Sequence, residues 1–279
     1  PGTYNLTVTN TVNQCSATDQ VEVTEDSGVP MAEAGVDLTL TCSVTSVNID
    51  ASASTSGAGI QYQWTGPGIA GANATAQNPQ GITLPGTYNL TVTNTVNSCV
   101  NTDVVVITID TISPLSSAGA GFTLNCYNGN ADTLDASAST TGNNFTLLWT
   151  GPAITPANQN LLKPVVNQAG TYTVLITNII NNCTASSDAI VLSDTLSPIA
   201  DAGTDGIIDC ANSVVSIGGN SSSGADFEYL WTGPDINAAN EALATLSIGQ
   251  AGPYTLVVTD VSNGCTAAND VLVNEDLVY

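Results

Sequence analysis

A repeat of about 83 residues runs through the 279-residue chain and limits its fold more than any other feature, because a period of this size is the length of a small domain. A tyrosine motif followed by alternating apolar residues occurs four times at nearly constant spacing. A Trp-Thr-Gly-Pro motif occurs three times with a similar period. The chain is therefore an array of similar domains. The repeated aromatic residues, which we expect in the cores, are Tyr4, Tyr88, Tyr172, Tyr254, Trp64, Trp149 and Trp231.

The repeat places domain boundaries near residues 27, 112 and 196. Residues 1–27 then correspond to the last third of a repeat, and complete repeats follow at 28–112, 113–196 and 197–279. We expect the sequence to be a window on a longer array. The alternative is that another chain completes the first repeat by strand exchange.

Within a repeat, the hydrophobic pattern has a period of two residues. Tyr88, Leu90 and Val92 alternate with polar residues, and the stretches 60–64 and 105–109 behave similarly. Alternation of this kind, rich in Thr and Val, predicts β-strands, and no stretch predicts a helix. Several short strands in about 84 residues, with a Trp on a central one, predict an all-β fold of β-sandwich domains.

The charge composition excludes several functions. The chain has 1 Lys or Arg, 24 Asp or Glu and no His, and its formal net charge is −23. One lysine cannot neutralise nucleic-acid phosphates or form a basic membrane-binding patch. Without histidine there is no Ser-His-Asp or Cys-His catalysis, and we expect no enzyme activity and no cofactor. No apolar run approaches the roughly 20 residues of a membrane helix, so this segment has no membrane span.

Seven cysteines indicate an oxidising, extracellular compartment. We favour pairing within each repeat, which joins an early strand to the turn before the last strand, with the partner of Cys15 outside the segment. A second possibility pairs neighbours across the linkers, as 15–42, 99–126 and 183–210. A metal thiolate site is the third, but the sequence lacks CxxC spacing. The favoured disulfides are Cys42–Cys99, Cys126–Cys183 and Cys210–Cys265.

The repeats resemble PKD-type immunoglobulin-like domains. The Cys-bearing variety is similar to tandem repeats of large surface adhesins of Bacteroidota-type gliding bacteria, which are exported by a type IX secretion system. The resemblance implies a tandem array of immunoglobulin-like β-sandwiches on a cell surface. The third repeat departs from the pattern, with Gly218-Gly219-Asn220-Ser221 in place of Asp-Ala-Ser-Ala. The residues that carry the resemblance are Ala34-Gly35, Asp50-Ala51-Ser52-Ala53-Ser54, Trp64, Gly86-Thr87-Tyr88-Asn89-Leu90-Thr91-Val92-Thr93, Cys99 and Val105-Val106-Ile107.

Two kinds of surface site are candidates. Calcium is the one metal for which this chain has suitable ligands, which are hard carboxylate oxygens. The alternative is that these acidic residues only keep the linkers solvated. Asp-Thr-aliphatic triplets look like the O-glycosylation motif of the resembled bacteria, although a strand-ending turn also explains them. The calcium candidates are Glu25, Asp26, Glu33, Asp37, Asp194, Asp201 and Asp205. The glycosylation candidates are Thr111, Thr133 and Thr195.

Strand alternation also predicts an interface. In an immunoglobulin-like sandwich the Trp strand, the Tyr strand and the final strand share one sheet. Aligned repeats place three aliphatic side chains together on its outer face in the second and third complete repeats, whereas the first has a more polar set. A contiguous exposed apolar patch favours packing against identical chains in a homo-oligomeric fibre. A one-residue shift in register or cover by the same chain would remove the patch. Its residues are Leu148, Leu175, Ile190, Leu230, Val257 and Leu272.

Two functions fit this pattern. The first is a structural segment of an extracellular fibre or adhesin stalk that bears tension and projects a binding tip toward another cell's surface. The second is an adhesive module whose own loops bind glycan or protein. One recurring domain without a divergent or aromatic-rich loop favours the stalk.

Overall fold

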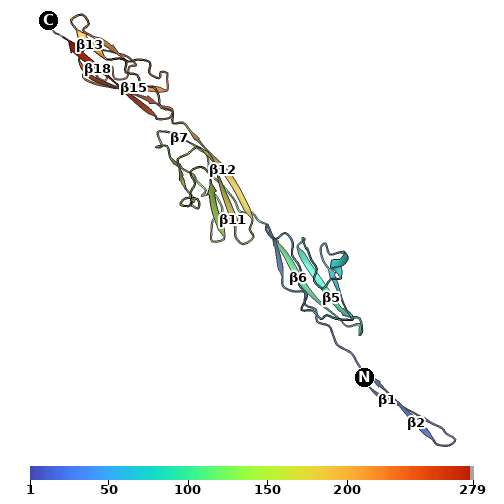
Figure 1. Ribbon diagram of the computed structural model, residues 1–279. Helices are drawn as coiled ribbons and strands as arrows, with labels where there is room; N and C mark the ends of the chain where they lie inside the picture. Colours follow the sequence, from blue (N-terminus) through green and yellow to red (C-terminus); the bar gives the residue numbers. More distant parts are fainter. Residues whose placement is uncertain (277–279) are drawn as a thin grey trace. The chain divides into compact units, whose positions relative to one another are not determined.

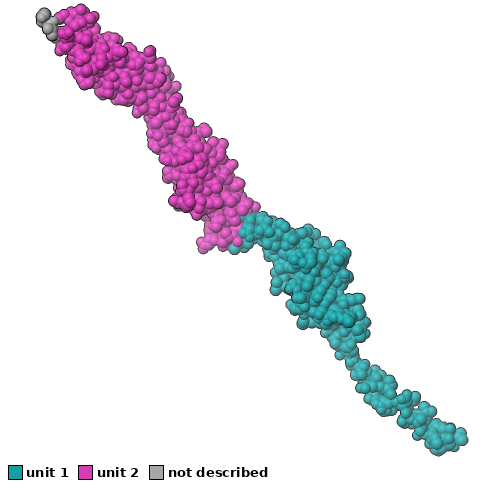
Figure 2. All heavy atoms as spheres, viewed as in Figure 1, with its two compact units in different colours: residues 1–112, 180–183 teal, residues 113–179, 184–279 magenta. Residues whose placement is uncertain are grey.

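The computed structural model describes residues 1–276 of the chain, whose regular secondary structure is almost entirely β-strand (Figure 1). No α-helix occurs in these residues, and η1 (Gly71–Ala74) is a single 3₁₀ turn. The chain forms two compact units, of which one holds residues 1–112 with 180–183 and the other holds residues 113–179 with 184–276 (Figure 2).

Residues 1–27 form a hairpin of β1 (Gly2–Thr9) and β2 (Ser16–Val23). The two strands pair antiparallel from Gly2 opposite Val23 to Thr9 opposite Ser16. Both strands are exposed along their whole length, and the Tyr4 side chain is 59% exposed. The hairpin has the sequence of the last two strands of a repeat without a packed core of its own.

The first complete repeat has a four-stranded sheet in the order β3-β6-β5-β4. The early strand β3 lies parallel to the final strand β6, and the other neighbours are antiparallel. Opposite this sheet, Val47 and Ile82 form a single bridge. The strands are β3 (Leu38–Thr41), β4 (Ile60–Thr65), β5 (Gly86–Asn94) and β6 (Val100–Asp110).

The second and third complete repeats have the same sheet, in the orders β7-β12-β11-β9 and β13-β18-β17-β15. Each adds a two-stranded sheet, β8 with β10 and β14 with β16. The second repeat contains β7 (Phe122–Leu124), β8 (Asp132–Thr133), β9 (Phe145–Thr150), β10 (Val165–Val166), β11 (Gly170–Asn178) and β12 (Thr184–Ser193). The third contains β13 (Gly206–Asp209), β14 (Val215–Ile217), β15 (Phe227–Thr232), β16 (Leu246–Ile248), β17 (Gly252–Asp260) and β18 (Thr266–Asp276).

Each complete repeat has its own hydrophobic core, and its tryptophan and tyrosine are buried there, as the sequence predicts. The indole N–H of Trp64 donates to the carbonyl of Ala76 at 3.0 Å, which satisfies the one polar group of that side chain. Trp149 and Trp231 make the same bond to the carbonyl twelve residues on.

The tyrosine at the start of each penultimate strand closes a corner. The hydroxyl of Tyr88 donates to the carbonyl of Leu84 at 2.6 Å, and Tyr172 and Tyr254 repeat this bond four residues upstream at 2.7 and 2.8 Å. A corner of this kind, a Trp on the neighbouring strand and a Greek-key sandwich are features of immunoglobulin domains. The repeats are therefore tandem immunoglobulin-like β-sandwiches.

The Trp-Thr-Gly-Pro motif serves the same corner. Gly66 lies against the Tyr88 ring, where a Cβ atom would come within 2.5 Å of the ring carbon Cδ1. A larger residue at this position would displace the tyrosine from the core. The motif therefore recurs because the tyrosine corner recurs.

Candidate functional site

The cysteines of one repeat lie at opposite ends of its main sheet. We call Cys42, Cys126 and Cys210 early cysteines, because they follow the early strands, and Cys15, Cys99, Cys183 and Cys265 turn cysteines. In the first complete repeat, Thr41 pairs with Asp110 at the end of β6, whereas Cys99 precedes the start of β6. About twelve strand residues, or roughly 40 Å, therefore separate Cys42 from Cys99.

A disulfide requires Cα atoms less than about 7 Å apart, so pairing within a repeat is ruled out by this topology. The predicted disulfides Cys42–Cys99, Cys126–Cys183 and Cys210–Cys265 are wrong. The sequence alternative, in which neighbouring cysteines pair across the linkers, is wrong as well.

The early cysteine of one repeat instead binds the turn cysteine of the repeat that follows. Cys42 bonds Cys183 with a Cα–Cα distance of 5.1 Å, and Cys126 bonds Cys265 with a Cα–Cα distance of 5.0 Å. The two bridges span 141 and 139 residues of sequence. The predicted single disulfide inside each domain is thus replaced by one disulfide across each junction between complete repeats.

Each turn cysteine belongs to an Asn-x-Cys turn with one shared conformation. In all four turns the Cys N–H donates to the side-chain oxygen of the Asn two residues before, at 2.9–3.0 Å. The middle residue has a positive φ in every case: 61° at Gln14, 60° at Ser98, 55° at Asn182 and 75° at Gly264. The turns that carry no disulfide therefore have the same conformation as the bonded ones.

The asparagine of the turn also docks onto the preceding repeat. The Nδ2 group of Asn181 donates to Asp110 Oδ1 at 2.8 Å and to the carbonyl of Ile112 at 3.1 Å. Asn263 repeats both contacts with Asp194 and Leu196, at 3.0 Å each. Both asparagine side chains are 1% exposed, so these bonds are shielded from water.

A junction therefore consists of three parts: an early cysteine, the last strand end of the same repeat, and the Asn-x-Cys turn of the following repeat. Sequence reasoning missed the asparagine. The repeat contained the signal, because an asparagine precedes each of the four turn cysteines by two residues. These asparagines are Asn13, Asn97, Asn181 and Asn263.

Three cysteines in the described part of the chain are free thiols: Cys15, Cys99 and Cys210. Each occupies the position of a bonded cysteine in another repeat. Asn97, two residues before Cys99, donates to the carbonyl of Gly28 at 3.0 Å, so this turn makes the linker-carbonyl contact of the bonded turns.

The acidic residues considered as calcium ligands mostly accept hydrogen bonds from backbone groups. Asp37 Oδ1 accepts from the Val106 N–H at 2.8 Å, and Asp205 Oδ1 accepts from the Leu272 N–H at 2.9 Å. Asp26 accepts from Gly28, while Asp194 belongs to the junction. Within residues 1–276, no three acidic or other metal-binding side chains gather into a set that could hold a metal ion.

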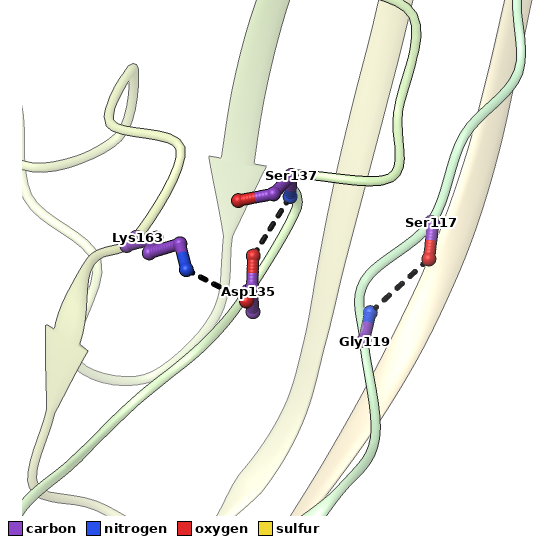
Figure 3. A network of polar contacts seen from close by, with 5 residues as sticks. All are labelled: Ser117, Gly119, Asp135, Ser137 and Lys163. Atoms are coloured by element: carbon purple, nitrogen blue, oxygen red, sulfur yellow. Dashed lines mark hydrogen bonds and ion pairs between the residues drawn. The ribbon is translucent and has the colours of Figure 1, made fainter.

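The Asp-Ala-Ser-Ala motif makes a local polar network. In the second complete repeat, Asp135 accepts a hydrogen bond from the Ser137 N–H at 2.8 Å and pairs with the Lys163 ammonium at 2.9 Å (Figure 3). Hydrogen bonds from Ser137 and from Lys163 lower the pKa of Asp135 to about 2. The divergent third repeat uses Asp201 instead, whose pKa is lowered by hydrogen bonds from the backbone N–H groups of Asn220 and Gly203.

The proposed interface residues are on the outer face of the main sheets, as alternation predicts, but they do not form one patch. Leu148 pairs directly with Leu175, whereas Ile190 pairs with Thr171, four residues further along β11 and roughly 13 Å away. Thr173 and Asp188 lie between them and share a hydrogen bond of 2.6 Å. In the third repeat, likewise, Leu230 pairs with Val257 while Leu272 pairs with Pro253. The predicted group of three side-by-side aliphatics is wrong, and a cross-strand pair remains.

The three threonines considered for glycosylation, Thr111, Thr133 and Thr195, are all exposed. Thr111 and Thr195 follow Asp110 and Asp194 in the linkers, beside the docked asparagines. Their modification stays a prediction.

Comparison with known proteins gives likeness of fold and no family assignment. No protein-family model matches the chain, and no curated protein matches it. Among solved structures, an I-band fragment from titin covers 90% of this chain and 100% of its own length, with 12% identity and a TM-score of 0.43. Sidekick-1 immunoglobulin domains 1–5 cover 99% of this chain, with 11% identity and a TM-score of 0.36, and the match spans 67% of that structure.

A third similar structure is the N-terminal eight Ig domains of Down Syndrome Cell Adhesion Molecule. It covers 99% of this chain at 12% identity, with a TM-score of 0.39, while the match spans 40% of that structure. Among residues 1–276 of this chain, no helix is both long and apolar enough to cross a membrane.

Proposed function

We propose that the chain is a non-catalytic, tension-bearing segment of an extracellular surface fibre or adhesin stalk, whose consecutive repeats are joined covalently by staggered disulfides. The observation that carries this proposal is the repeated junction. Both junctions between complete repeats combine a disulfide with the same buried asparagine contacts. Repeats that served only as loosely linked binding modules would not need a covalent bond at each linker.

The stagger shortens the path along which a pulled chain can extend. The shortest covalent path follows the sequence to Cys42, crosses to Cys183, returns along the sequence to Cys126, crosses to Cys265 and continues to the end. At roughly 3.4 Å per residue, this path measures about 380 Å, whereas the chain without bridges measures about 950 Å.

Tension therefore passes through the disulfides and across the folded second repeat instead of along the linkers. The buried asparagine hydrogen bonds add a second connection beside each disulfide. Both effects suit a segment that holds a tip away from a cell.

The same bonds support an extracellular location. Stable disulfides form in oxidising compartments and are rare in the reducing cytoplasm. The free early and turn cysteines fit a pattern in which further repeats of this kind supply their partners. Export by a type IX system is what the resemblance of the repeats to gliding-bacterial adhesins implies.

The test is single-molecule stretching of the chain between its two ends. The oxidised chain should stop extending at less than half the contour length that the reduced chain reaches. Equal contour lengths in the two conditions would overturn the proposal.

Lateral association of identical chains is a further part of this proposal. The cross-strand pairs Leu148–Leu175 and Leu230–Val257 support it, with Leu148 and Leu230 exposed and Leu175 and Val257 half-buried, although each pair is smaller than the patch expected from sequence. Leu175→Asp combined with Val257→Asp should lower the mass measured by light scattering. Thr91→Asp, at the corresponding polar site of the first repeat, is the matched control. Assembly unaffected by the double substitution, or a native chain that is monomeric at high concentration, would place no interface there.

A further inference from the structure

The two bonded junctions differ at a pair of facing positions. The residue after the early cysteine faces the residue before the turn cysteine. In the first junction these are Ser43 and Asn182, and the Asn182 Nδ2 group donates to the Ser43 hydroxyl oxygen at 3.1 Å. In the second junction they are Tyr127 and Gly264.

Tyr127 lies directly on Gly264. A Cβ atom at Gly264 would fall 2.7–2.8 Å from three carbons of the Tyr127 ring, closer than real Cβ contacts. The ring is held there because its hydroxyl donates to the carbonyl of Val261 at 3.0 Å, while the Cys126 N–H donates to the carbonyl of Asn263 at 3.0 Å.

The backbone of the turn does not itself require glycine. Gln14, Ser98 and Asn182 adopt φ values of 55–61° at the corresponding position, and the Cys N–H still donates to the Asn side-chain oxygen in each turn. Asn and similar polar residues tolerate this left-handed conformation. The ring of Tyr127 is therefore what excludes a side chain at Gly264.

We propose that this residue pair determines which Asn-x-Cys turn each early cysteine pairs with. Tyr127 admits a turn with glycine before its cysteine, and of the four turns in the sequence only the one at Gly264 has it. Ser43 leaves room for a side chain and supplies a hydrogen-bond acceptor to Asn182. The partner recognised in each case is a repeat of the same kind, selected by the residue before its turn cysteine.

This selection of the partner turn takes place before the covalent bond forms. A docked turn holds its thiol beside the early thiol, and exchange with a small-molecule disulfide such as oxidised glutathione completes the bridge. The two protein thiols are oxidised to one disulfide, and the glutathione disulfide is reduced to two thiols, which take the two protons. A turn that clashes with the facing residue does not hold its sulfur in place.

The proposal does not depend on the array bearing tension. The test is oxidative refolding of the reduced full chain in a glutathione redox buffer, followed by alkylation and mapping of the disulfide-linked peptides. Gly264→Asn gives the second junction the turn residue of the first. It should reduce the yield of the Cys126–Cys265 bond by about ten-fold, because the Tyr127 ring must leave the turn and give up its hydrogen bond to Val261.

A second substitution distinguishes selection by the facing residues from a general folding defect. Tyr127→Ser in the Gly264→Asn background should restore the Cys126–Cys265 yield to within about two-fold of the native chain, because an overlap penalty is removed with the ring. The Cys42–Cys183 bond of the same molecules is the internal control and should form normally throughout. An undiminished yield in Gly264→Asn, or a loss that Tyr127→Ser does not repair, would overturn the proposal.

The reciprocal exchange tests the first junction. Ser43→Tyr should prevent the Cys42–Cys183 bond, and adding Asn182→Gly should restore it. A Ser43→Tyr chain that bonds Cys42 to Cys183 at the native yield would show that the facing residues do not select the turn.

Discussion

The staggered disulfides predict a stretching response in which the two bridges do not act independently. At roughly 3.4 Å per residue, opening Cys126–Cys265 alone lengthens the shortest covalent path by about 85 Å. On the same scale, opening Cys42–Cys183 alone lengthens it by about 90 Å, and opening both lengthens it by about 560 Å.

The reason is that the two bridged segments overlap between Cys126 and Cys183. While one bridge remains, it still bypasses 141 or 139 residues of sequence. Most of the hidden length is therefore released only with the second bridge, whichever is lost first.

The assay is force spectroscopy on a chain tethered at both ends, taken to full extension. The bridges are removed as pairs, Cys42→Ser with Cys183→Ser and Cys126→Ser with Cys265→Ser, so that no new thiol is created. A background in which the three free cysteines are serines prevents exchange. The same background with both bridges intact is the control.

Independent bridges inside single repeats would behave differently. Each would hide about 190 Å of chain at roughly 3.4 Å per residue, and the gains would add. Additive gains of that size would refute the staggered path.

Three further outcomes are expected. Asn181→Ala should destabilise the first junction by about 1–3 kcal/mol, because it leaves buried polar partners unsatisfied, and the hydrogen-exchange rate of residues 180–183 should rise accordingly. Asn13→Ala, in an exposed turn, is the control and should have a smaller effect on its own turn. Equal effects of the two substitutions would contradict the docking role of Asn181. Asp135 has a folded pKa of about 2 against 3.8 for the free side chain, so its stabilisation is present above about pH 4 and is lost as the pH falls through about 2, and unfolding curves of Asp135→Asn should lack this part of the acid dependence. Trypsin should leave even the reduced, denatured chain intact, because the one basic residue, Lys163, precedes Pro164, and prompt fragmentation on a gel would contradict this.

Much of the fold follows from the sequence because the repeat copies the same local constraints three times. Alternation predicts Tyr88 and Trp64 in the core, where they are 0% and 1% exposed. The sequence of each repeat is strongly constrained here, because a tyrosine corner requires the glycine beside the ring, the buried ring itself and the carbonyl four residues upstream.

The disulfide prediction is wrong because spacing along the sequence does not give direction in space. The nearly constant interval between Cys42 and Cys99, and between their equivalents, favours pairing within a repeat. The early strand, however, lies parallel to the final strand, and this topology carries Cys42 to the far end of the sheet from Cys99. A period-two pattern cannot tell a parallel neighbour from an antiparallel one.

The interface prediction fails in part for a related reason. Alternation correctly assigns Leu175 and Ile190 to the outer face of the sheet. It does not give the strand register, in which Ile190 lies opposite Thr171, four residues from Leu175. Register depends on turn geometry and strand ends, which the alignment of repeats to one another does not contain.

Disulfide mapping of the native chain tests the central claim most directly. The free thiols are alkylated without reduction, and the chain is digested with an acid protease, since trypsin has no useful site. We expect linked peptides that join Cys42 to Cys183 and Cys126 to Cys265, with alkylated Cys15, Cys99 and Cys210. Peptides that join Cys42 to Cys99, or Cys126 to Cys183, would contradict the covalent junctions and the mechanical role built on them.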